Sequence, residues 1–436
     1  MNWKKVIQLT MVHVGVSMSV VPITSTLNRI MIADLHFSAL LVGFLISLPY
    51  LLSPLQVLIG NWADRTPIWG RYRSPWMVLG GLMATFGSYM TPHAVFLLQE
   101  QWALGLIACL GAFVVWGMGV NIASVSYLSL VSELSPEQSN WRSRAVSFMW
   151  TTMILATIIT ALLLGRLLET YTPATLYTAF GAIWLIASIL ILFGAANVEP
   201  PPTAARISRH QANQPLAALH LLTTNQSARR FFVYLLLVLI SIHAQDVLLE
   251  PFGAEALQMP VAQTSRLTSI WGTGVFLTLT GGVLLVRRFG KKKVANGGAV
   301  LAALGFTAIA FAGLGGAING FMAAVFVLGL GGGLMTVSNL SFMLDMTIPE
   351  AAGLYMGAWG VANFAGQALG NIVSGLLRDV IYQVTGNVLI GYVSVFGMEV
   401  VGLLIAVQLF RTISVAEFRR DAAIRIQDVL TLAIDS

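Results

Sequence analysis

The sequence predicts an all-α polytopic membrane protein with twelve transmembrane helices in two halves of six. Only 10% of the 436 residues are charged and 57% are hydrophobic, whereas a water-soluble domain normally carries about 25% charged residues. Apolar runs of the length that a helix needs to cross the hydrocarbon layer, about 20 residues, recur along the chain. These runs form two groups of six separated by one polar stretch. The surface is therefore expected to face lipid.

Each apolar run defines one expected helix. The first six lie near 6–27, 38–61, 75–92, 103–131, 145–165 and 174–195, and the second six near 231–250, 267–286, 294–315, 318–344, 352–377 and 387–410. The first run lacks a small-residue cleavage site and is followed by further spans. We therefore interpret it as a transmembrane helix and not as a cleaved signal peptide.

The polar stretch between the two groups is predicted to be a linker, because it contains Pro200–Pro202 and four arginines but no long apolar run. The expected organisation is a six-helix half at 1–196, a cytoplasmic linker at 197–230, a six-helix half at 231–411 and a cytoplasmic tail at 412–436. The tail mixes apolar residues with arginines, which favours an amphipathic helix on the membrane surface. A disordered tail is the alternative.

The basic residues predict the orientation. If loops alternate sides from the N-terminus, 20 of the 24 Lys and Arg residues fall on one side, and only Arg29, Arg166, Arg266 and Arg378 fall on the other. Cytoplasmic loops carry the excess of Lys and Arg, so both termini are expected in the cytoplasm. Contact with anionic lipid headgroups accounts for the formal charge of +6, and no nucleic-acid partner is expected.

The chain lacks the patterns of an enzyme. Its one cysteine, Cys109, permits neither an intramolecular disulfide nor a Cys-based metal site. The run Gly331–Gly333 lacks the Lys-Ser/Thr pair of a phosphate-binding loop. No nucleophile–base pair or metal-ligand cluster stands out in the sequence. We therefore expect a non-enzymatic membrane protein.

The loop after the second span resembles the signature loop of the major facilitator superfamily. The matching positions are Gly60, Asp64, Arg65, Gly70, Arg71 and Arg73. The sequence departs from the family pattern by several residues inserted between Arg65 and Gly70. A basic copy without the aspartate follows Gly282, at Arg287–Lys293, which indicates an internal repeat. The resemblance implies a gate loop whose charge contacts hold one state shut; a basic loop that only sets topology is the alternative.

Ionisable residues within apolar spans are candidate functional groups, because each is costly in lipid unless it is paired or hydrated. His13 lies in the first expected helix and Glu399 in the last. In the seventh, His243, Asp246 and Glu250 are spaced i, i+3 and i+7, which predicts one shared helical face. Asp246, Glu250 and Glu399 are candidates for protonation or for a polar network. Buried groups that only fix helix packing are the alternative.

Three stretches are similar to the PucC/LhaA group, the bacteriochlorophyll-delivery branch of the major facilitator superfamily. The first is 14–60, which includes Thr26–Ile32; the second is Ala244–Gly253, followed by Thr268–Gly272; the third is Gly357–Asp379. The string from Gln245 to Pro251 is the most specific, because generic transporters lack it.

This resemblance implies a protein of phototrophs in a bacterial inner, intracytoplasmic or thylakoid membrane. The implied function is to deliver chlorophyll or bacteriochlorophyll to light-harvesting or photosystem polypeptides, or to assist their assembly, with pigment-biosynthesis enzymes as further partners. A proton-coupled small-molecule transporter and a non-transporting scaffold are the competing interpretations.

The cargo also suggests ligands. The magnesium of the pigment accepts one axial ligand, and the imidazole of histidine is the commonest metal ligand in proteins. His13 and His243 lie in the first helices of the two halves and are the expected ligands. Asn28 and Gln245 are alternative donors. No other metal is expected.

Overall fold

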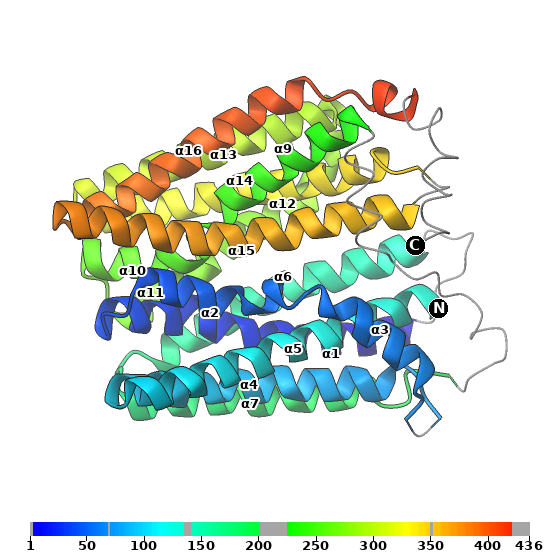
Figure 1. Ribbon diagram of the computed structural model, residues 1–436, viewed down its shortest axis with the longest axis horizontal. Coiled ribbons are helices and arrows are strands. Elements are labelled where there is room, and N and C mark those ends of the chain that lie inside the picture. The colour runs from blue at the N-terminus through cyan, green and yellow to red at the C-terminus, as the bar shows by residue number, and fades with distance from the viewer. Residues whose placement is uncertain (1–2, 69, 135–140, 201–224, 349–351, 421–436) are drawn as a thin grey trace. The chain divides into compact units, whose positions relative to one another are not determined.

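The computed structural model is almost entirely helical (Figure 1). It describes residues 3–68, 70–134, 141–200, 225–348 and 352–420, apart from the side chains at 57, 61, 63–65, 142, 143 and 352–354. In these ranges β-structure is limited to one isolated bridge, between Ile68 and Arg71. Nine stretches of the described chain are long and apolar enough to cross a membrane. The predicted all-α membrane class is confirmed.

The six spans expected before the linker all correspond to helices. These are α1 (Trp3–Pro22) with the π-helical turns η1 (Ile23–Leu27) and η2 (Ile30–Asp34), α2 (Ala39–Leu51), α3 (Leu55–Arg65), α4 (Ser74–Glu100), α5 (Trp102–Leu134), α6 (Trp141–Leu167) and α7 (Pro173–Ala195). The span expected at 38–61 is interrupted between α2 and α3. Pro54 lies in this interruption, and its ring removes a backbone donor that a continuous helix would use.

The second group of helices follows the linker. It consists of α9 (Gln226–His243), α10 (Gln245–Leu257), α11 (Val261–Ser265), α12 (Leu267–Phe289), α13 (Lys291–Leu314), α14 (Ile318–Asp345), α15 (Ala352–Thr385) and α16 (Val388–Arg411). Of the expected tail, residues 415–420 are helical. The remainder of the tail and residues 201–224 of the linker lie outside the described ranges.

The chain divides into two compact units. Unit 1 comprises Met1–Gln211 together with Val247–Gly272, and unit 2 comprises Ala212–Asp246 together with Thr273–Ser436. The segment Val247–Gly272 comes after the linker in sequence, yet it groups with the helices that precede the linker. Within unit 1, α11 packs on α6 and on η1. The four-segment division expected from sequence remains a prediction.

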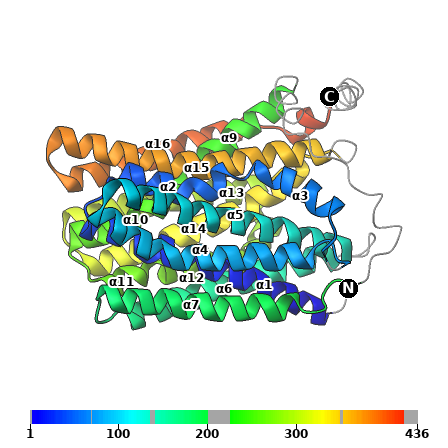
Figure 2. The ribbon, with the colours of Figure 1, turned by 60° about the horizontal axis from the view of Figure 1, so that its bottom comes forward.

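Each unit is a bundle of closely packed helices. In unit 1, α4 packs against α5, and α1 against α6 and α7. In unit 2, α13 packs against α14, and α9, α15 and α16 pack on one another (Figure 2). Large apolar side chains cover the outer faces; Phe193 is 66% exposed and Phe311 69%. Water disfavours such exposure, and lipid does not.

Candidate functional site

Two acidic residues that the sequence analysis did not single out hold the loop between α3 and α4. The backbone N–H groups of Tyr72, Arg73 and Ser74 donate to the carboxylate of Glu199 at 3.0, 3.0 and 2.7 Å. This carboxylate therefore lies at the N-terminus of α4, where unpaired N–H groups and the helix dipole stabilise an anion. Glu133, near the end of α5, accepts a hydrogen bond from Nε of Arg73 at 2.8 Å.

The expected gate-loop residues occupy different parts of this structure. Gly60 lies within α3, and Gly70 adopts a φ of +69°, a conformation that a residue without a Cβ reaches without strain. Arg71 donates from Nη2 to Oδ1 of Asn197 at 3.0 Å. Asp64 and Arg65 fall outside the described side chains. The gating role of the loop remains a prediction.

The corresponding loop of unit 2 contains an equivalent ion pair. Lys291, the first residue of α13, places Nζ 2.7 Å from Oδ2 of Asp345, the last residue of α14. In unit 1 the Arg73–Glu133 pair likewise links the start of α4 to the last turn of α5. An acidic residue one or two positions after the expected fourth and tenth spans was the sequence signal for both pairs. The recurrence supports the internal repeat.

The residues of the family-like stretches meet inside unit 1. Glu250 is buried; its Oε2 accepts a hydrogen bond from Nδ2 of Asn28 at 3.3 Å, and its Oε1 accepts one from Oγ1 of Thr268 at 3.0 Å. The hydroxyls of Thr26 and Ser265 are 2.8 Å apart. Thr26 and Asn28 belong to the first family-like stretch, and Glu250 and Thr268 to the second. Asn28 acts here as a donor to a carboxylate.

A second polar cluster lies in unit 2, at the junction of α9 and α10. Nδ1 of His243 lies 2.8 Å from Oδ2 of Asp246, and Nε2 of Gln245 lies 3.5 Å from Oδ1 of the same carboxylate. Glu399 of α16 is fully buried, and neither of its carboxylate oxygens has a hydrogen-bond partner among the described residues. α9 ends at His243 and α10 begins at Gln245, but Ala244 between them keeps helical dihedral angles, φ −58° and ψ −29°. His243 and Asp246 are in contact, as their spacing on one face predicts, and the place of Glu250 on the same face remains a prediction.

His13 is enclosed within unit 1. Its side chain is 4% exposed and packs against the rings of Tyr127 and Trp150, at centroid distances of 4.9 and 5.7 Å. Its Nδ1 has no hydrogen-bond partner in the described chain. A buried imidazole between two aromatic rings has little room for a large planar ligand.

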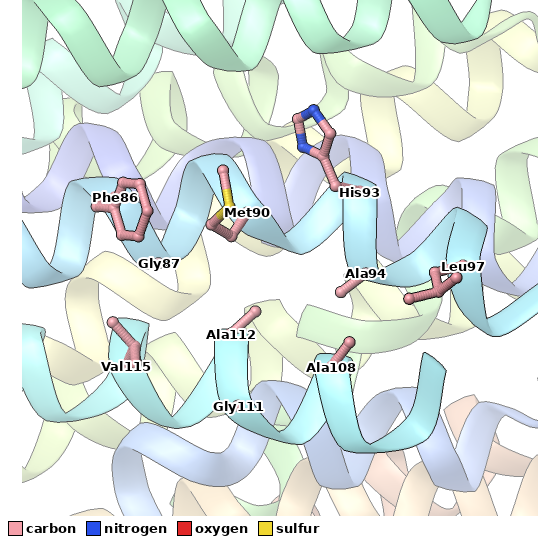
Figure 3. A pocket seen from close by; sticks show the side chains of 10 residues that line it. All are labelled: Phe86, Gly87, Met90, His93, Ala94, Leu97, Ala108, Gly111, Ala112 and Val115. Atoms are coloured by element: carbon pink, nitrogen blue, oxygen red, sulfur yellow. The ribbon is translucent and has the colours of Figure 1, made fainter. Parts of the chain in front are cut away.

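An apolar groove of about 360 Å³ lies between α4 and α5 (Figure 3). Small side chains line most of it, whereas α4 also contributes bulky ones. The lining residues are Phe86, Gly87, Met90, His93, Ala94, Leu97, Ala108, Gly111, Ala112 and Val115. A Cβ added at Gly111 would meet no atom within 4 Å, so this side of the groove is open.

Among the described residues that line this groove, His93 alone has an ionisable side chain. Its Nδ1 lies 3.2 Å from the backbone oxygen of Tyr89, and its ring stacks on Tyr177 at a centroid distance of 4.3 Å. A carbonyl at Nδ1 favours the tautomer in which Nδ1 donates and Nε2 carries the free lone pair. His93 was not expected in a membrane span, because the third span was predicted to end at residue 92. The apolar run 94–98 was the signal that the helix continues.

The PUCC protein family model matches residues 26–418. The chain belongs to the PucC family. Curated relatives of this PucC-family chain include Protein PucC of Cereibacter sphaeroides, 28% identical over 91% of this chain and 89% of that protein. The "Uncharacterized protein in puhA-bchM intergenic region" of Rhodobacter capsulatus is also 28% identical, over 87% and 80%. The "Bacteriochlorophyll synthase 44.5 kDa chain" of the same species is 27% identical, over 87% and 88%.

Solved structures establish the fold of this PucC-family protein. A mutant of the nucleoside transporter NupG matches with a TM-score of 0.74 at 16% identity, over 94% of this chain and 99% of that one. A D-xylose–proton symporter matches with a TM-score of 0.71 at 15% identity, over 94% and 97%. Identity at this level shows the fold alone. The fold is that of the major facilitator superfamily.

Proposed function

We propose that this protein delivers chlorophyll or bacteriochlorophyll to light-harvesting or photosystem polypeptides, or assists the assembly of these polypeptides with pigment. The observation that carries the proposal is the family match, which extends from residue 26 to residue 418 and so includes both halves. A relative whose name refers to bacteriochlorophyll supports the pigment connection. The partners would be these polypeptides, pigment-biosynthesis enzymes and membrane lipid, in a phototrophic membrane with both termini in the cytoplasm.

The groove between α4 and α5 is the place where we propose that pigment binds. Its volume lies within the range of about 300–1,000 Å³ that is usual for ligand pockets. Phe86, on its rim, is 47% exposed, and the neighbouring Ile107 is 68% exposed, so the groove opens towards the lipid-facing surface. A chlorophyll is a flat, apolar ring with a prenyl tail, and it could enter such a groove without leaving the bilayer.

His93 supplies the polar contact that this pigment requires. Nε2 of His93 has no hydrogen-bond partner in the described chain, while Nδ1 is engaged by the carbonyl of Tyr89. Histidines that bind metals usually have their second ring nitrogen held in this way. We therefore propose His93 as the axial ligand of the pigment magnesium. His13→Ala and His243→Ala, which remove the ligands expected from sequence, are measured in the same way.

The test is an absorption titration of the full-length protein in lipid nanodiscs with chlorophyll a or bacteriochlorophyll a. We expect near-stoichiometric binding by the wild type and at least about tenfold weaker binding by His93→Ala, because the axial ligand is lost. Gly111→Leu should weaken binding similarly by filling the groove. Matched controls are His36→Ala, at an exposed loop histidine, and Gly281→Leu, where an added Cβ also meets no atom within 4 Å.

Two outcomes separate the parts of this proposal. Full pigment binding by both His93→Ala and Gly111→Leu would exclude the groove; loss of binding in His13→Ala or His243→Ala would then favour the ligands expected from sequence. Absence of binding by the wild type, together with normal antenna assembly in a phototrophic host that lacks the protein, would reject the pigment-delivery function.

A further inference from the structure

Three helices of unit 2 pack closely against one another at one level. A Cβ added at Gly370 of α15 would lie 2.8 Å from the carbonyl oxygen of Ile240 in α9. A Cβ at Gly402 of α16 would lie 2.2 Å from Oγ of Ser241. The two glycines therefore allow α15 and α16 to approach the end of α9 closely, next to its junction with α10.

Several polar atoms at this level lack partners. Neither carboxylate oxygen of Glu399 and neither amide atom of Asn371 has a hydrogen-bond partner among the described residues, and both side chains are 0% exposed. Oε1 of Gln245 is also buried and unpartnered in the described chain. Nearly all buried polar atoms in proteins are hydrogen-bonded, so five such atoms in one region of a bundle point to a ligand.

The helix register places Glu399 and Asn371 at the same depth. α15 and α16 form an antiparallel hairpin, in which a Cβ at Gly391 would lie 2.9 Å from the carbonyl oxygen of Arg378. Eight residues along each helix, about 12 Å, Glu399 comes opposite Gly370, the neighbour of Asn371. A Cβ at Gly370 would also lie 3.4 Å from the carbonyl carbon of His243, so the junction of α9 and α10, with His243 and Asp246, lies at this level as well.

The charged groups around Glu399 are few. On the α9–α10 side they are Asp246 and its partner His243. α13, which packs on α16, contributes no ionisable side chain after Lys293. The nearest ionisable side chains of α15 towards its C-terminal end are Arg378 and Asp379, which lie about two turns beyond Asn371. Among the described residues, no Lys or Arg donates to the carboxylate of Glu399.

We propose that Glu399 is a proton-binding site within unit 2, loaded and unloaded through Asp246 and His243. A buried carboxyl without donors or a counter-cation is far less costly in its protonated form than as a carboxylate. The amide of Asn371 can accept a hydrogen bond from the protonated group or donate one to the carboxylate. Among the described residues no group of three or more His, Cys, Asp or Glu side chains is arranged for a metal ion, which favours a proton as the ligand.

The proposed transfer is balanced in atoms and charge. In loading, an O–H or N–H bond of the Asp246–His243 pair breaks and an O–H bond forms at Glu399. The positive charge of one proton moves with it, so Glu399 becomes neutral while the pair becomes more negative by one. The side chains of His243 and Asp246 are 27% and 26% exposed, whereas Glu399 is enclosed, so the pair is the route by which the proton reaches the surface of unit 2.

Infrared difference spectroscopy of full-length protein in nanodiscs tests this site. The carbonyl stretch of a protonated carboxyl is distinct from that of a carboxylate and shifts when the proton exchanges for deuterium. We expect a slowly exchanging band in the wild type and its loss in Glu399→Gln, which is nearly isosteric. Glu100→Gln, at an exposed position at the end of α4, is the control and should keep the band.

The route is tested by the rate of deuterium exchange at this band. We expect Asp246→Asn to slow the exchange roughly a hundredfold, the order of magnitude that a positioned proton-transfer group contributes, and His243→Ala to slow it as well. A band that persists in Glu399→Gln, or a wild type without any such band, would overturn the site. Exchange at the wild-type rate in both route variants would overturn the proposed path. Elution of every variant as a single peak confirms folding.

Discussion

At the scale of single residues, the best-defined contacts of the signature loop are made by side chains outside it. Glu199 follows α7 and accepts three backbone hydrogen bonds at the start of α4. The basic residues of the loop were recognisable from sequence because their spacing resembles a known pattern. Glu199 and Glu133 were not, because an acidic residue becomes a partner only when the fold brings its helix end to the loop.

The carboxylate of Glu199 should contribute measurably to stability. In Glu199→Gln one oxygen becomes an NH₂ group that faces backbone donors, and the negative charge at the helix N-terminus is lost. We expect a loss of about 1–3 kcal/mol, the usual cost of unsatisfied buried hydrogen-bonding groups. Thermal unfolding monitored by tryptophan fluorescence measures it, with Glu100→Gln as control. Equal midpoints for the two variants would contradict this role.

The partners of Glu250 illustrate the same limit. Asn28 and Glu250 were each singled out from sequence, one as a pigment donor and the other as an ionisable group in a span. Their hydrogen bond joins positions 222 residues apart, and only the packing of α10 within unit 1 brings them together. His93 was overlooked for a simpler reason, since the expected helix boundary fell one residue before it.

At the scale of helices, composition gave the number and order of the spans, while their interruptions depend on local packing. The expected span 174–195 corresponds to α7 at Pro173–Ala195, and 318–344 to α14 at Ile318–Asp345. Proline alone does not predict where helices break. Pro54 lies at an interruption, whereas Pro92 lies inside α4, where neighbouring helices in the bundle can compensate for the lost hydrogen bond.

Close packing of α4 on α5 depends on glycines at defined positions. A Cβ added at Gly119 would lie 2.2 Å from the backbone nitrogen of Ala84, too close for any side chain. Gly119→Ala should therefore force the helices apart and lower the stability by about 1–3 kcal/mol, as overpacking does. Gly111→Ala, on the same helix but with no atom within 4 Å of the added Cβ, is the matched control.

The measurement for this pair is the unfolding midpoint in detergent, with the elution profile as a check on folding. A midpoint for Gly119→Ala that equals that of Gly111→Ala would show that the contact between α4 and α5 is not as close as described.

At the scale of the whole molecule, the fold class could be predicted from the sequence, because a surface that faces lipid must be made of apolar residues. A sequence with only 10% charged residues and with repeated apolar runs leaves few alternatives to a helical bundle in lipid. The division of the chain into two units could not be predicted from hydropathy. Hydropathy reports how much of a segment is apolar and not which helices it contacts, so it could not reveal that Val247–Gly272 groups with unit 1.

The predicted orientation can be tested by labelling single introduced cysteines, because the chain has only one natural cysteine. Cys109 is the only cysteine and is buried, so Cys109→Ala provides a background without thiols. In intact cells a membrane-impermeant maleimide should label Gln101→Cys, in the turn between α4 and α5, because this turn is expected outside. Thr412→Cys, after α16, should be labelled only once the membrane is permeabilised. The reverse pattern would contradict the positive-inside assignment.

Because Val247–Gly272 belongs to unit 1, a cut in the linker does not separate the two units. A fragment that ends in the linker contains α1–α7 but lacks α10 and α11. In this fragment Asn28 has lost its hydrogen-bond partner Glu250, and Thr26 has lost its partner Ser265. The other fragment would carry the apolar segment Val247–Gly272 without the helices of unit 1 on which this segment packs. We therefore expect that neither fragment folds stably alone and that the two parts of this chain fold together.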